Sequence, residues 1–318
     1  MSNKTDSLGV RLGYRAVYGA CWLFGLLPHW VLYHPVADVV YFLLYRVVRY
    51  RVKVVRENLA ASFPERSEAE LRGIERRFFR NLAEYFIDAI DIASITPRGR
   101  IRRCPWPDAN RAELVSQTAG RNWVALLSHY GSWEMLSAFG LYRDASAMVS
   151  AYRPLKNRVF DLYYIKVRNV PPRVNSVPSS ETLRFLSAHR DGIDGSSLSV
   201  ALIADQIPPI DAQSRWVKFL NHPTVFFHGG EKIARKFAMP VYYMRVRKVG
   251  RGMWEQTFDL IWDGVSPTSD YDITGAYARL LEEDIRRTPE LWLWSHRRWK
   301  WGPQGDDARA YEEKYGSL

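Results

Sequence analysis

The sequence predicts an α/β protein with a central, largely parallel mixed sheet flanked by helices and an N-terminal helical membrane-associating extension. Two observations support this prediction. Strand-like and helix-like segments alternate from Trp123 onward, which is typical of a parallel sheet covered by helices. The N-terminal part of the chain instead contains interrupted apolar runs that are rich in tryptophan and tyrosine.

The composition is that of a folded, basic protein. Of the 318 residues, 47% are hydrophobic and 25% are charged, which argues against an intrinsically disordered chain. The formal net charge of +11 indicates an acidic partner: an anionic membrane surface, an acidic protein, a phosphorylated substrate or nucleic acid. Because Cys21 and Cys104 form no CxxC pair, we expect neither a disulfide framework nor structural zinc, and a reducing compartment fits.

Residues 8–48 are predicted to form one or two helices that lie in a membrane interface. Neither apolar run reaches the roughly 18–20 residues of a spanning helix, and no A-x-A-like cleavage site follows the first. Aromatic residues favour headgroup depth, and basic residues favour the anionic cytoplasmic face. The aromatic residues are Trp22, Trp30, Tyr33 and Tyr41, and the basic cluster is Arg46, Arg49, Arg51, Lys53 and Arg56. The alternative is an ordinary buried hairpin of helices.

Residues 67–92 have the pattern of a long amphipathic helix. Ser67 and Glu70 have capping-box spacing, and apolar residues recur at helical intervals after them. Because the apolar stripe is wide, we expect it to pack in the core. The basic segment 97–103 is predicted to be a surface loop that could contact anions.

From residue 123 the expected strands and helices alternate. The strands are 123–127, 147–152, 197–204, 240–249 and 254–262, and the helices are 155–169, 181–188, 231–237 and 271–287. Gly250-Arg251-Gly252 separates the last two strands, so they should form a hairpin. Residues 291–301 interleave aromatic and basic side chains, and we expect part of this tail to be a packed strand, although nucleic-acid or headgroup contact fits the same pattern.

No repeat or low-complexity linker interrupts the chain after its first part. We therefore expect membrane-associating helices in residues 1–60 and a single catalytic domain in residues 61–318.

The stretch after the first strand contains the residues best suited to catalysis. His129 follows the apolar run, and Glu134 comes five residues later, across a Gly131-Ser132 turn. If Ser132 N-caps a new helix, Glu134 lies in its first turn, where its carboxylate can contact the imidazole and raise its basicity. Such a histidine can take a proton from a hydroxyl. On spacing alone, a structural histidine in a loop remains an equal alternative.

Two further strand ends carry polar side chains. Arg153 follows the second strand, and Asp205-Gln206 follows the third. Because ligands bind beyond the carboxyl ends of strands in open α/β sheets, these residues are expected close to His129. The guanidinium of Arg153 suits a phosphate or carboxylate, and Asp205 could bind a cation or order a loop. The structural alternatives are a salt bridge of Arg153 to a nearby acid and an ordinary Asp-Gln turn.

Other kinds of site have little support in the sequence. No Walker loop or GxGxxG motif occurs, so nucleotide chemistry is not expected. Ser128 lacks a GxSxG elbow, which argues against a serine nucleophile. His222, His228 and Glu231 have no HExxH-like spacing, so we expect no metal and no cofactor.

Taken together, these segments resemble the bacterial lipid A biosynthesis acyltransferases, the lauroyl/myristoyl transferase family of the lysophospholipid-acyltransferase-like superfamily. The resemblance covers nearly the whole chain. The matching segments, in order, are 56–59 (RENL) with Phe63-Pro64, the H-x4-E motif at His129 and Glu134, 152–157 (YRPLKN), 204–206 (ADQ), 217–219 with 240–241, and 293–300 (LWSHRRWK).

The resemblance implies a glycerolipid-acyltransferase-like fold and transfer of a fatty acyl chain from acyl carrier protein to a hydroxyl of lipid A or its precursor. It implies that His129 is the general base with Glu134 as its partner, and that the hydroxyl attacks the thioester directly, without an acyl-enzyme. Further residues are then expected to bind substrate: Arg153, Asn157, Asp205 and Gln206. Negative charge on the carbonyl oxygen also needs a stabiliser, for which Arg153 and a backbone amide near Gly131 are candidates.

The resemblance also implies a location and partners. The enzyme would work at the cytoplasmic face of the inner membrane with acyl carrier protein and a glycolipid acceptor, and no nucleic acid is expected. The chain departs from the family after Asp205-Gln206, where Ile207-Pro208-Pro209 bears on the acceptor contacts. One alternative is an acyltransferase that acts on another membrane glycolipid or aminolipid. A second alternative is a non-enzymatic, basic membrane- or nucleic-acid-binding protein.

Overall fold

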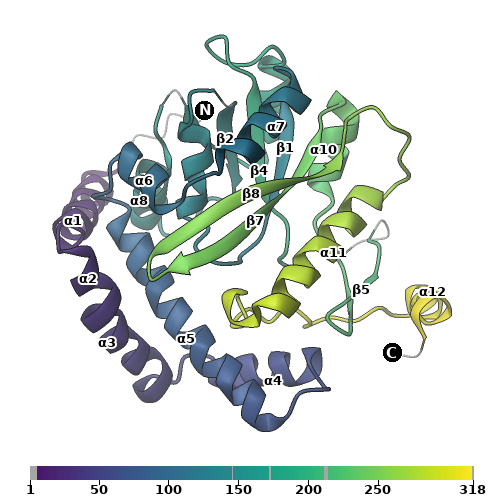
Figure 1. Ribbon diagram of the computed structural model, residues 1–318, viewed down its shortest axis with the longest axis horizontal. Helices are drawn as coiled ribbons and strands as arrows, with labels where there is room; N and C mark the ends of the chain where they lie inside the picture. The colour runs from purple at the N-terminus through teal and green to yellow at the C-terminus, as the bar shows by residue number, and fades with distance from the viewer. Residues whose placement is uncertain (1–5, 145, 172, 211–213, 317–318) are drawn as a thin grey trace.

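The computed structural model describes residues 6–144, 146–171, 173–210 and 214–316 and confirms the predicted α/β architecture (Figure 1). Its main sheet has six strands in the order β3-β2-β4-β1-β7-β8. Neighbouring strands are parallel except for the antiparallel pair β7 and β8. The strands are β1 (Trp123–Leu127), β2 (Ala147–Tyr152), β3 (Val174–Pro178), β4 (Leu198–Ile203), β7 (Val241–Gly250) and β8 (Met253–Trp262).

The carboxyl ends of the parallel strands lie at one edge of the sheet. Leu127 of β1 pairs with Ile203 of β4, and β4 pairs in turn with β2. Every residue of β1 is buried, which explains its continuous apolar run, since a parallel sheet is covered on both faces. The segments that carry His129, Asp205 and Arg153 therefore leave three adjacent strands at the same edge, as predicted.

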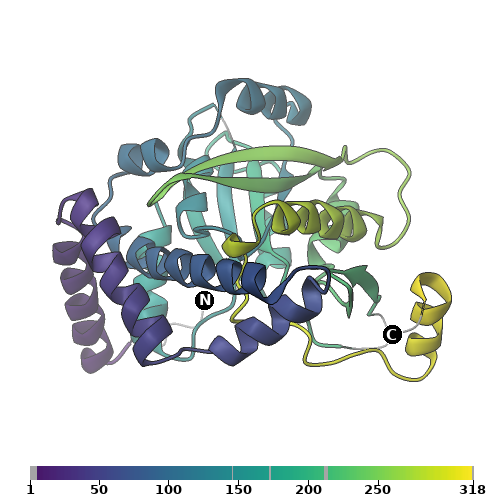
Figure 2. The same cartoon turned by 60° about the horizontal axis from the view of Figure 1, so that its bottom comes forward.

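Strands β7 and β8 form the predicted hairpin, whose tip reaches α5 (Glu68–Asp91) in both views (Figures 1 and 2). The tip is fixed by contacts from side chains that arrive from other elements. The carbonyl of Gly252 accepts a hydrogen bond from Arg103 Nε, at 2.9 Å. Gly252 has a φ of +65°, and a Cβ at this position would lie 2.4 Å from the ring of Tyr33. Only glycine fits this position without displacing that ring.

Helix α5 begins as the sequence predicts. Ser67 accepts a hydrogen bond from the backbone N–H of Glu70, whose carboxylate accepts from the backbone N–H of Ser67, so the capping box is complete. Ile74 and Phe78 of its apolar stripe are buried in the core. The remaining α-helices after residue 50 are α4 (Val52–Ser62), α6 (Pro97–Arg103), α7 (Asp108–Thr118), α8 (Arg158–Arg168), α9 (Thr182–Ala188), α10 (Gly229–Phe237), α11 (Asp272–Arg287) and α12 (Asp306–Tyr315).

The sequence prediction omitted several of these elements. Strand β3, helices α4, α7 and α12, and the small hairpin β5 (Val217–Phe219) with β6 (His222–Thr224) were not expected. Helix α12 stands apart from the sheet, on the opposite side of the molecule from the N-terminal helices (Figure 2).

The N-terminal residues form a bent pair of helical segments beside α5 (Figures 1 and 2). The first is α1 (Leu8–Phe24), and the second comprises α2 (His29–Val31), the π-helical turn η1 (Leu32–Val36), α3 (Ala37–Phe42) and the π-helical turn η2 (Leu43–Val47). In the described part of the chain, no single helix has the length and hydropathy to cross a membrane. The two segments meet those criteria only together, with a bend of 102° between them.

The aromatic residues of this pair do not all face outward. Trp22 and Trp30 are exposed, as headgroup contact would require. Tyr33 is fully buried, so its predicted place at headgroup depth is wrong. Its hydroxyl lies among the buried polar groups of Asp88 and Arg103, which hold the second helical segment against α5 and α6. A tyrosine with such partners gains more from the interior than from the headgroup zone.

The basic segment 97–103 was predicted to be a surface loop, and this prediction is wrong. It is helix α6, in which Thr96 caps the first turn through its side chain and Pro97 occupies the first helical position. Arg103 is buried and ion-paired with Asp88, at 2.8 Å. Arg103 therefore faces inward, because acidic side chains of α5 form ion pairs with it there.

Of the domain ranges expected from the sequence, residues 1–5, 145, 172, 211–213 and 317–318 lie outside the described residues.

Candidate active site

His129 lies two residues beyond the buried strand β1, at the edge where the parallel strands end. Its backbone carbonyl accepts a hydrogen bond from the N–H of Leu293, at 3.1 Å, so a segment near the C-terminus fixes the turn. The side chain retains 18% exposure. The imidazole is thus held by the protein but can still be reached from outside.

Asp205, which follows β4, is the carboxylate that contacts His129. Its Oδ1 lies 2.7 Å from His129 Nδ1, and its Oδ2 accepts from the backbone N–H of His129 at 3.0 Å. Trp292 Nε1 donates to the same Oδ2 at 2.9 Å. Burial raises the pKa of this carboxyl, but the imidazole and these hydrogen bonds outweigh burial, and the net pKa lies below the ordinary value. Asp205 is therefore ionised at neutral pH.

These contacts define the tautomer of the imidazole. Because Asp205 accepts at Nδ1, that nitrogen carries the proton, and the lone pair of Nε2 is free to act as a base. The amide nitrogen of Gln206 lies 3.1 Å from Nε2, where it can donate to that lone pair. The ring of Trp133 meets the imidazole edge-on, with 4.9 Å between centroids. The site thus presents an imidazole whose Nε2 lone pair faces the side-chain amide of Gln206.

Glu134 does not contact His129, which corrects the predicted pairing. Its carboxylate is buried and accepts from Arg168 Nε at 2.8 Å and from Arg168 Nη2 at 2.6 Å. The local geometry explains the difference. Gly131 turns the chain at a φ of +68°, and the short 3-10 helix η3 (Met135–Leu141) starts with Glu134, not Ser132, at its N-cap. The carboxylate is thereby directed toward α8 and away from the imidazole.

Arg153 and Asn157 lie in the exposed segment after β2. Arg153 makes no ion pair with any described residue. The nearby acids Asp161 and Glu134 pair instead with Arg158 and Arg168. Asn157 caps α8, since its side-chain oxygen accepts from the N–H groups of Val159 and Phe160 at 3.0 and 3.4 Å. Helix α8 therefore begins three residues later than the sequence predicted. The capping contact leaves only the amide nitrogen of Asn157 for a ligand.

A segment that we call the strap, residues 289–298, closes the site from the C-terminal side. It starts as the 3-10 turn η4 (Pro289–Leu291), and its backbone pairs with the turn after His129 as an isolated bridge between Tyr130 and Trp292. The predicted strand in this tail is therefore wrong, because Pro289 starts a turn and Trp292 points inward to Asp205. Burial of Trp292 and Trp294 likewise leaves these rings unavailable for stacking on nucleic-acid bases.

The strap also brings two basic side chains to the site that sequence reasoning missed. Arg298 is buried, donates to the carbonyl of Val225, and has a pKa that burial lowers to about 10 against the opposing charge of Asp205. Burial also lowers the pKa of His296, and the positive charge of Arg298 adds to this. The clustering of aromatic and basic residues in 291–301 was visible in the sequence, but it did not indicate which groups Arg298 and His296 would contact.

One candidate for stabilising the negative charge on the carbonyl oxygen, the backbone amide of Gly131, already has a hydrogen-bond partner. The backbone N–H of Gly131 donates to the carbonyl of Leu291 at 2.9 Å, so it is already used in fixing the strap. A developing negative charge would have to find other donors. Within the described ranges, no group of three or more His, Cys, Asp or Glu side chains could hold a metal ion.

Comparison with known proteins places this chain in a family. The profile described as bacterial lipid A biosynthesis acyltransferase matches residues 4–301. The chain is 23% identical over 306 residues to the lipid A biosynthesis lauroyltransferase of Escherichia coli K12, covering 92% of each chain. It is 22% identical over 273 residues to the lipid A biosynthesis palmitoleoyltransferase of the same organism and to the lipid A biosynthesis acyltransferase of Shigella flexneri, covering 81% of each chain. The protein thus belongs to the bacterial lipid A biosynthesis acyltransferase family and is an acyltransferase.

Proposed function

We propose that this acyltransferase moves a fatty acyl chain from the thioester of acyl carrier protein to a hydroxyl of lipid A or its precursor, with His129 as the general base. The observation that carries the proposal is the partly exposed imidazole of His129, held by a buried, ionised Asp205 at the carboxyl edge of the sheet. A base at this edge can reach a substrate that binds beyond the strands.

The reaction follows from the proton positions. The acceptor hydroxyl displaces the amide of Gln206 from Nε2 and gives its proton to His129 as its oxygen attacks the thioester carbonyl carbon. The carbon–sulfur bond of the resulting tetrahedral intermediate then breaks, and the imidazolium returns the proton to the leaving thiolate. Asp205 stabilises the imidazolium throughout, because its carboxylate faces Nδ1–H. No acyl-enzyme is formed.

Glu134 then has a positioning role in place of the predicted direct one. Its buried carboxylate forms an ion pair with the partly exposed Arg168 next to Trp133, whose ring touches the imidazole. Removing one partner of such a pair leaves a buried charge without compensation. We infer that Glu134 acts on His129 through the position of Trp133.

Arg153 and Gln206 are proposed to contact the substrates. Arg153 is exposed at the same edge as His129, and its planar guanidinium can bind a phosphate of the acceptor with two hydrogen bonds. Asn157 contributes through the start of α8, and its amide nitrogen remains available as a donor.

The partners and the location follow from charge and exposed apolar surface. The net charge of +11 suits an acidic carrier protein and the anionic leaflet on the cytoplasmic side of the inner membrane. We propose that residues 1–60 attach the enzyme to this leaflet and that residues 61–318 form the catalytic domain. Exposed Trp22 and Trp30 support attachment through the bent helical pair.

His129→Ala tests the mechanism. Because the base is lost, we expect the transfer rate from acyl carrier protein to a lipid A precursor to fall by about 10²–10⁴-fold. His189→Ala is the matched control, since that imidazole contacts the carbonyl of Phe185 at the end of α9 and should leave the rate unchanged. A His129→Ala enzyme with near-normal kcat and a native unfolding curve would refute the assignment.

Another membrane glycolipid or aminolipid is the alternative acceptor. The observation that favours it is the apolar segment Ile207-Pro208-Pro209 directly after Gln206, where contacts to the acceptor are proposed. Mass spectrometry of isolated lipid A and of total lipids, from cells with and without the protein, separates the two. An unchanged lipid A mass together with a lost acyl chain on another lipid would assign the alternative acceptor.

A further inference from the structure

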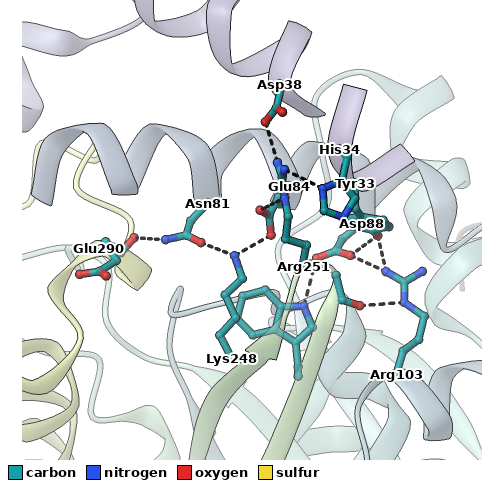
Figure 3. Close-up of polar contacts among 12 residues, drawn as sticks. Tyr33, His34, Asp38, Asn81, Glu84, Asp88, Arg103, Lys248, Arg251 and Glu290 are labelled. Atoms are coloured by element: carbon teal, nitrogen blue, oxygen red, sulfur yellow. Dashed lines mark hydrogen bonds and ion pairs between the residues drawn. The ribbon is translucent and has the colours of Figure 1, made fainter. Parts of the chain in front are cut away.

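A cavity of about 740 Å³ lies outside the site described above, at the seam between α3, α5, the end of β7 and residues 288–291. Its volume is in the range of pockets that hold small ligands. The polar side chains around it come from four separate parts of the chain and are linked to one another (Figure 3). Neither the family membership nor the proposed mechanism assigns a role to this cavity.

Ion pairs fix the basic side chains of the cavity in place. The buried carboxylate of Glu84 accepts from Lys248 Nζ at 2.6 Å and from Arg251 Nε at 2.9 Å. Arg251 Nη2 also donates to Asp38, at 2.8 Å, and Lys248 Nζ to Asn81, at 2.6 Å (Figure 3). Because these cations are held by two acceptors each, they lose little further freedom when a ligand binds.

The lining residues carry one more positive than negative charge. Four cations (Arg77, Arg80, Lys248 and Arg251) face three carboxylates (Asp38, Glu84 and Glu290). Arg80 is the unpaired member, because no described carboxylate lies within ion-pair distance of it. Its guanidinium rests on the ring of Tyr41, 5.4 Å from the centroid, so the N–H groups at its edge remain free. Arg80 is exposed, so these donors are available to a ligand that accepts hydrogen bonds and carries negative charge.

Apolar side chains border the same cavity. Phe42 lines it and is 55% exposed, and Val39 and Leu43 of the same helical segment are 57% and 46% exposed. These residues share one helical face, since they are three or four positions apart. An anion site bordered by exposed apolar residues suits a phosphate joined to hydrocarbon better than a free phosphate ion.

The residues of the catalytic site do not line this cavity. His129, Asp205 and Gln206 are absent from its walls.

We propose that the cavity binds the phosphate headgroup of an anionic phospholipid of the bilayer, with Arg80 as the main contact. Arg77 and Arg251 complete the cationic wall, and Phe42 lies against the acyl region of the lipid. The cavity reaches Leu291, whose carbonyl accepts from the N–H of Gly131 at 2.9 Å. A bound headgroup therefore also contacts the start of the strap that holds the turn after His129.

The test measures binding of the full-length protein to vesicles by co-sedimentation, without any acyl donor. Vesicles of phosphatidylcholine are compared with vesicles of phosphatidylcholine and phosphatidylglycerol. Arg80→Ala should weaken binding to the phosphatidylglycerol vesicles by about tenfold, as loss of a charge-assisted hydrogen bond to phosphate does. Arg80→Lys, which keeps the charge but loses the planar fork, should be intermediate.

Arg76→Ala is the matched control. Arg76 is exposed one turn earlier on α5, lies outside the cavity and makes no described ion pair, so its loss changes the net charge equally. We expect this variant to stay within about twofold of the unmodified protein, because it tests only non-specific attraction. Equal weakening by Arg76→Ala and Arg80→Ala would overturn the proposal.

Two further outcomes are decisive. If Arg80→Ala weakens binding to pure phosphatidylcholine vesicles by the same factor, Arg80 acts on general attachment and the site for an anionic phospholipid is refuted. If it raises the KM for a phosphorylated acceptor in phosphatidylcholine vesicles without changing phosphatidylglycerol binding, the cavity belongs to the acceptor. Because binding is measured without catalysis, failure of the His129 mechanism would not alter these results.

Discussion

Replacement of Asp205 by asparagine tests the assignment of the carboxylate that supports His129. In the protein, this carboxylate accepts three N–H groups: His129 Nδ1–H on Oδ1, and the backbone N–H of His129 and Trp292 Nε1–H on Oδ2. Asparagine keeps the shape of the side chain but has one acceptor oxygen and an NH2 group. Its oxygen is best placed at Oδ2, where two donors meet, so its NH2 group faces Nδ1.

This arrangement changes the tautomer of His129. Nδ1 must now accept a hydrogen bond, the ring proton moves to Nε2, and Nε2 loses the lone pair that takes the proton of the acceptor. We expect kcat to fall by about 10²–10⁴-fold, equivalent to about 3–5 kcal/mol of transition-state stabilisation. The free energy of unfolding should fall by only about 1–2 kcal/mol, because all three positions can still form neutral hydrogen bonds.

The assay is acyl transfer from acyl carrier protein to a lipid A precursor, with kcat and KM determined separately. Urea unfolding of the same preparations reports stability. Glu134→Gln is the comparison, since the sequence suggested that this carboxylate supports His129, whereas the structure directs it to Arg168. If Asp205→Asn kept kcat within about tenfold of normal while Glu134→Gln lost it, the reasoning from the Asp205 contact would be refuted.

Three further predictions follow from other contacts. Gln206→Glu places a carboxylate beside His129 Nε2 and favours the protonated imidazole, so the ascending limb of the pH profile of kcat/KM should move to higher pH; an unmoved limb contradicts this. Gly252→Ala should cost about 1–3 kcal/mol in urea unfolding, because its Cβ would press on a buried tyrosine ring, whereas Gly195→Ala, also at positive φ but in open space, should cost less. Burial lowers the pKa of His222, so the unfolded chain binds more protons, and the free energy of unfolding should fall as the pH drops below about 6.5. His222→Asn should flatten that dependence in urea unfolding measured between pH 5 and pH 8, and an unchanged slope would contradict it.

Local patterns predicted the elements of the fold well, because each depends on residues close together in sequence. The capping box at Ser67 and Glu70 and the Gly250-Arg251-Gly252 turn act within a few residues, so their signals are complete in the sequence. The helix predicted for residues 155–169 begins about one turn too early. The cap at Asn157 sets the true start, but the sequence around it does not mark that start strongly.

The candidate site was predicted in its position but not in its pairing. Three strand ends met as expected because parallel strands place their carboxyl ends together. The partner of His129, however, is Asp205, which is 76 residues away in sequence, and no local spacing encodes such a contact. The H-x4-E spacing suggested Glu134 as the partner of His129, because the two residues are close in sequence. In the structure, the carboxylate of Glu134 instead pairs with Arg168.

Errors elsewhere have the same origin. Tyr33 looked like a headgroup residue and the segment 97–103 like a basic surface loop, because tryptophan, tyrosine and arginine are usually assigned by their average preferences. Tyr33 and Arg103 of that segment are instead buried beside Asp88 of α5. A polar cluster assembled from three helices has no periodicity in sequence, so only the fold reveals it.

The strap has a consequence for the order in which the enzyme becomes active. The turn after His129 is fixed by backbone contacts to Leu291 and Leu293, and Trp292 holds Asp205. Because ribosomes make the chain from its N-terminus, the helical segments of residues 8–47 emerge well before the strap. The nascent chain therefore carries residues 8–47 before the contacts that hold the turn after His129 and Asp205 can form, so the proposed base is not assembled until the strap has been made.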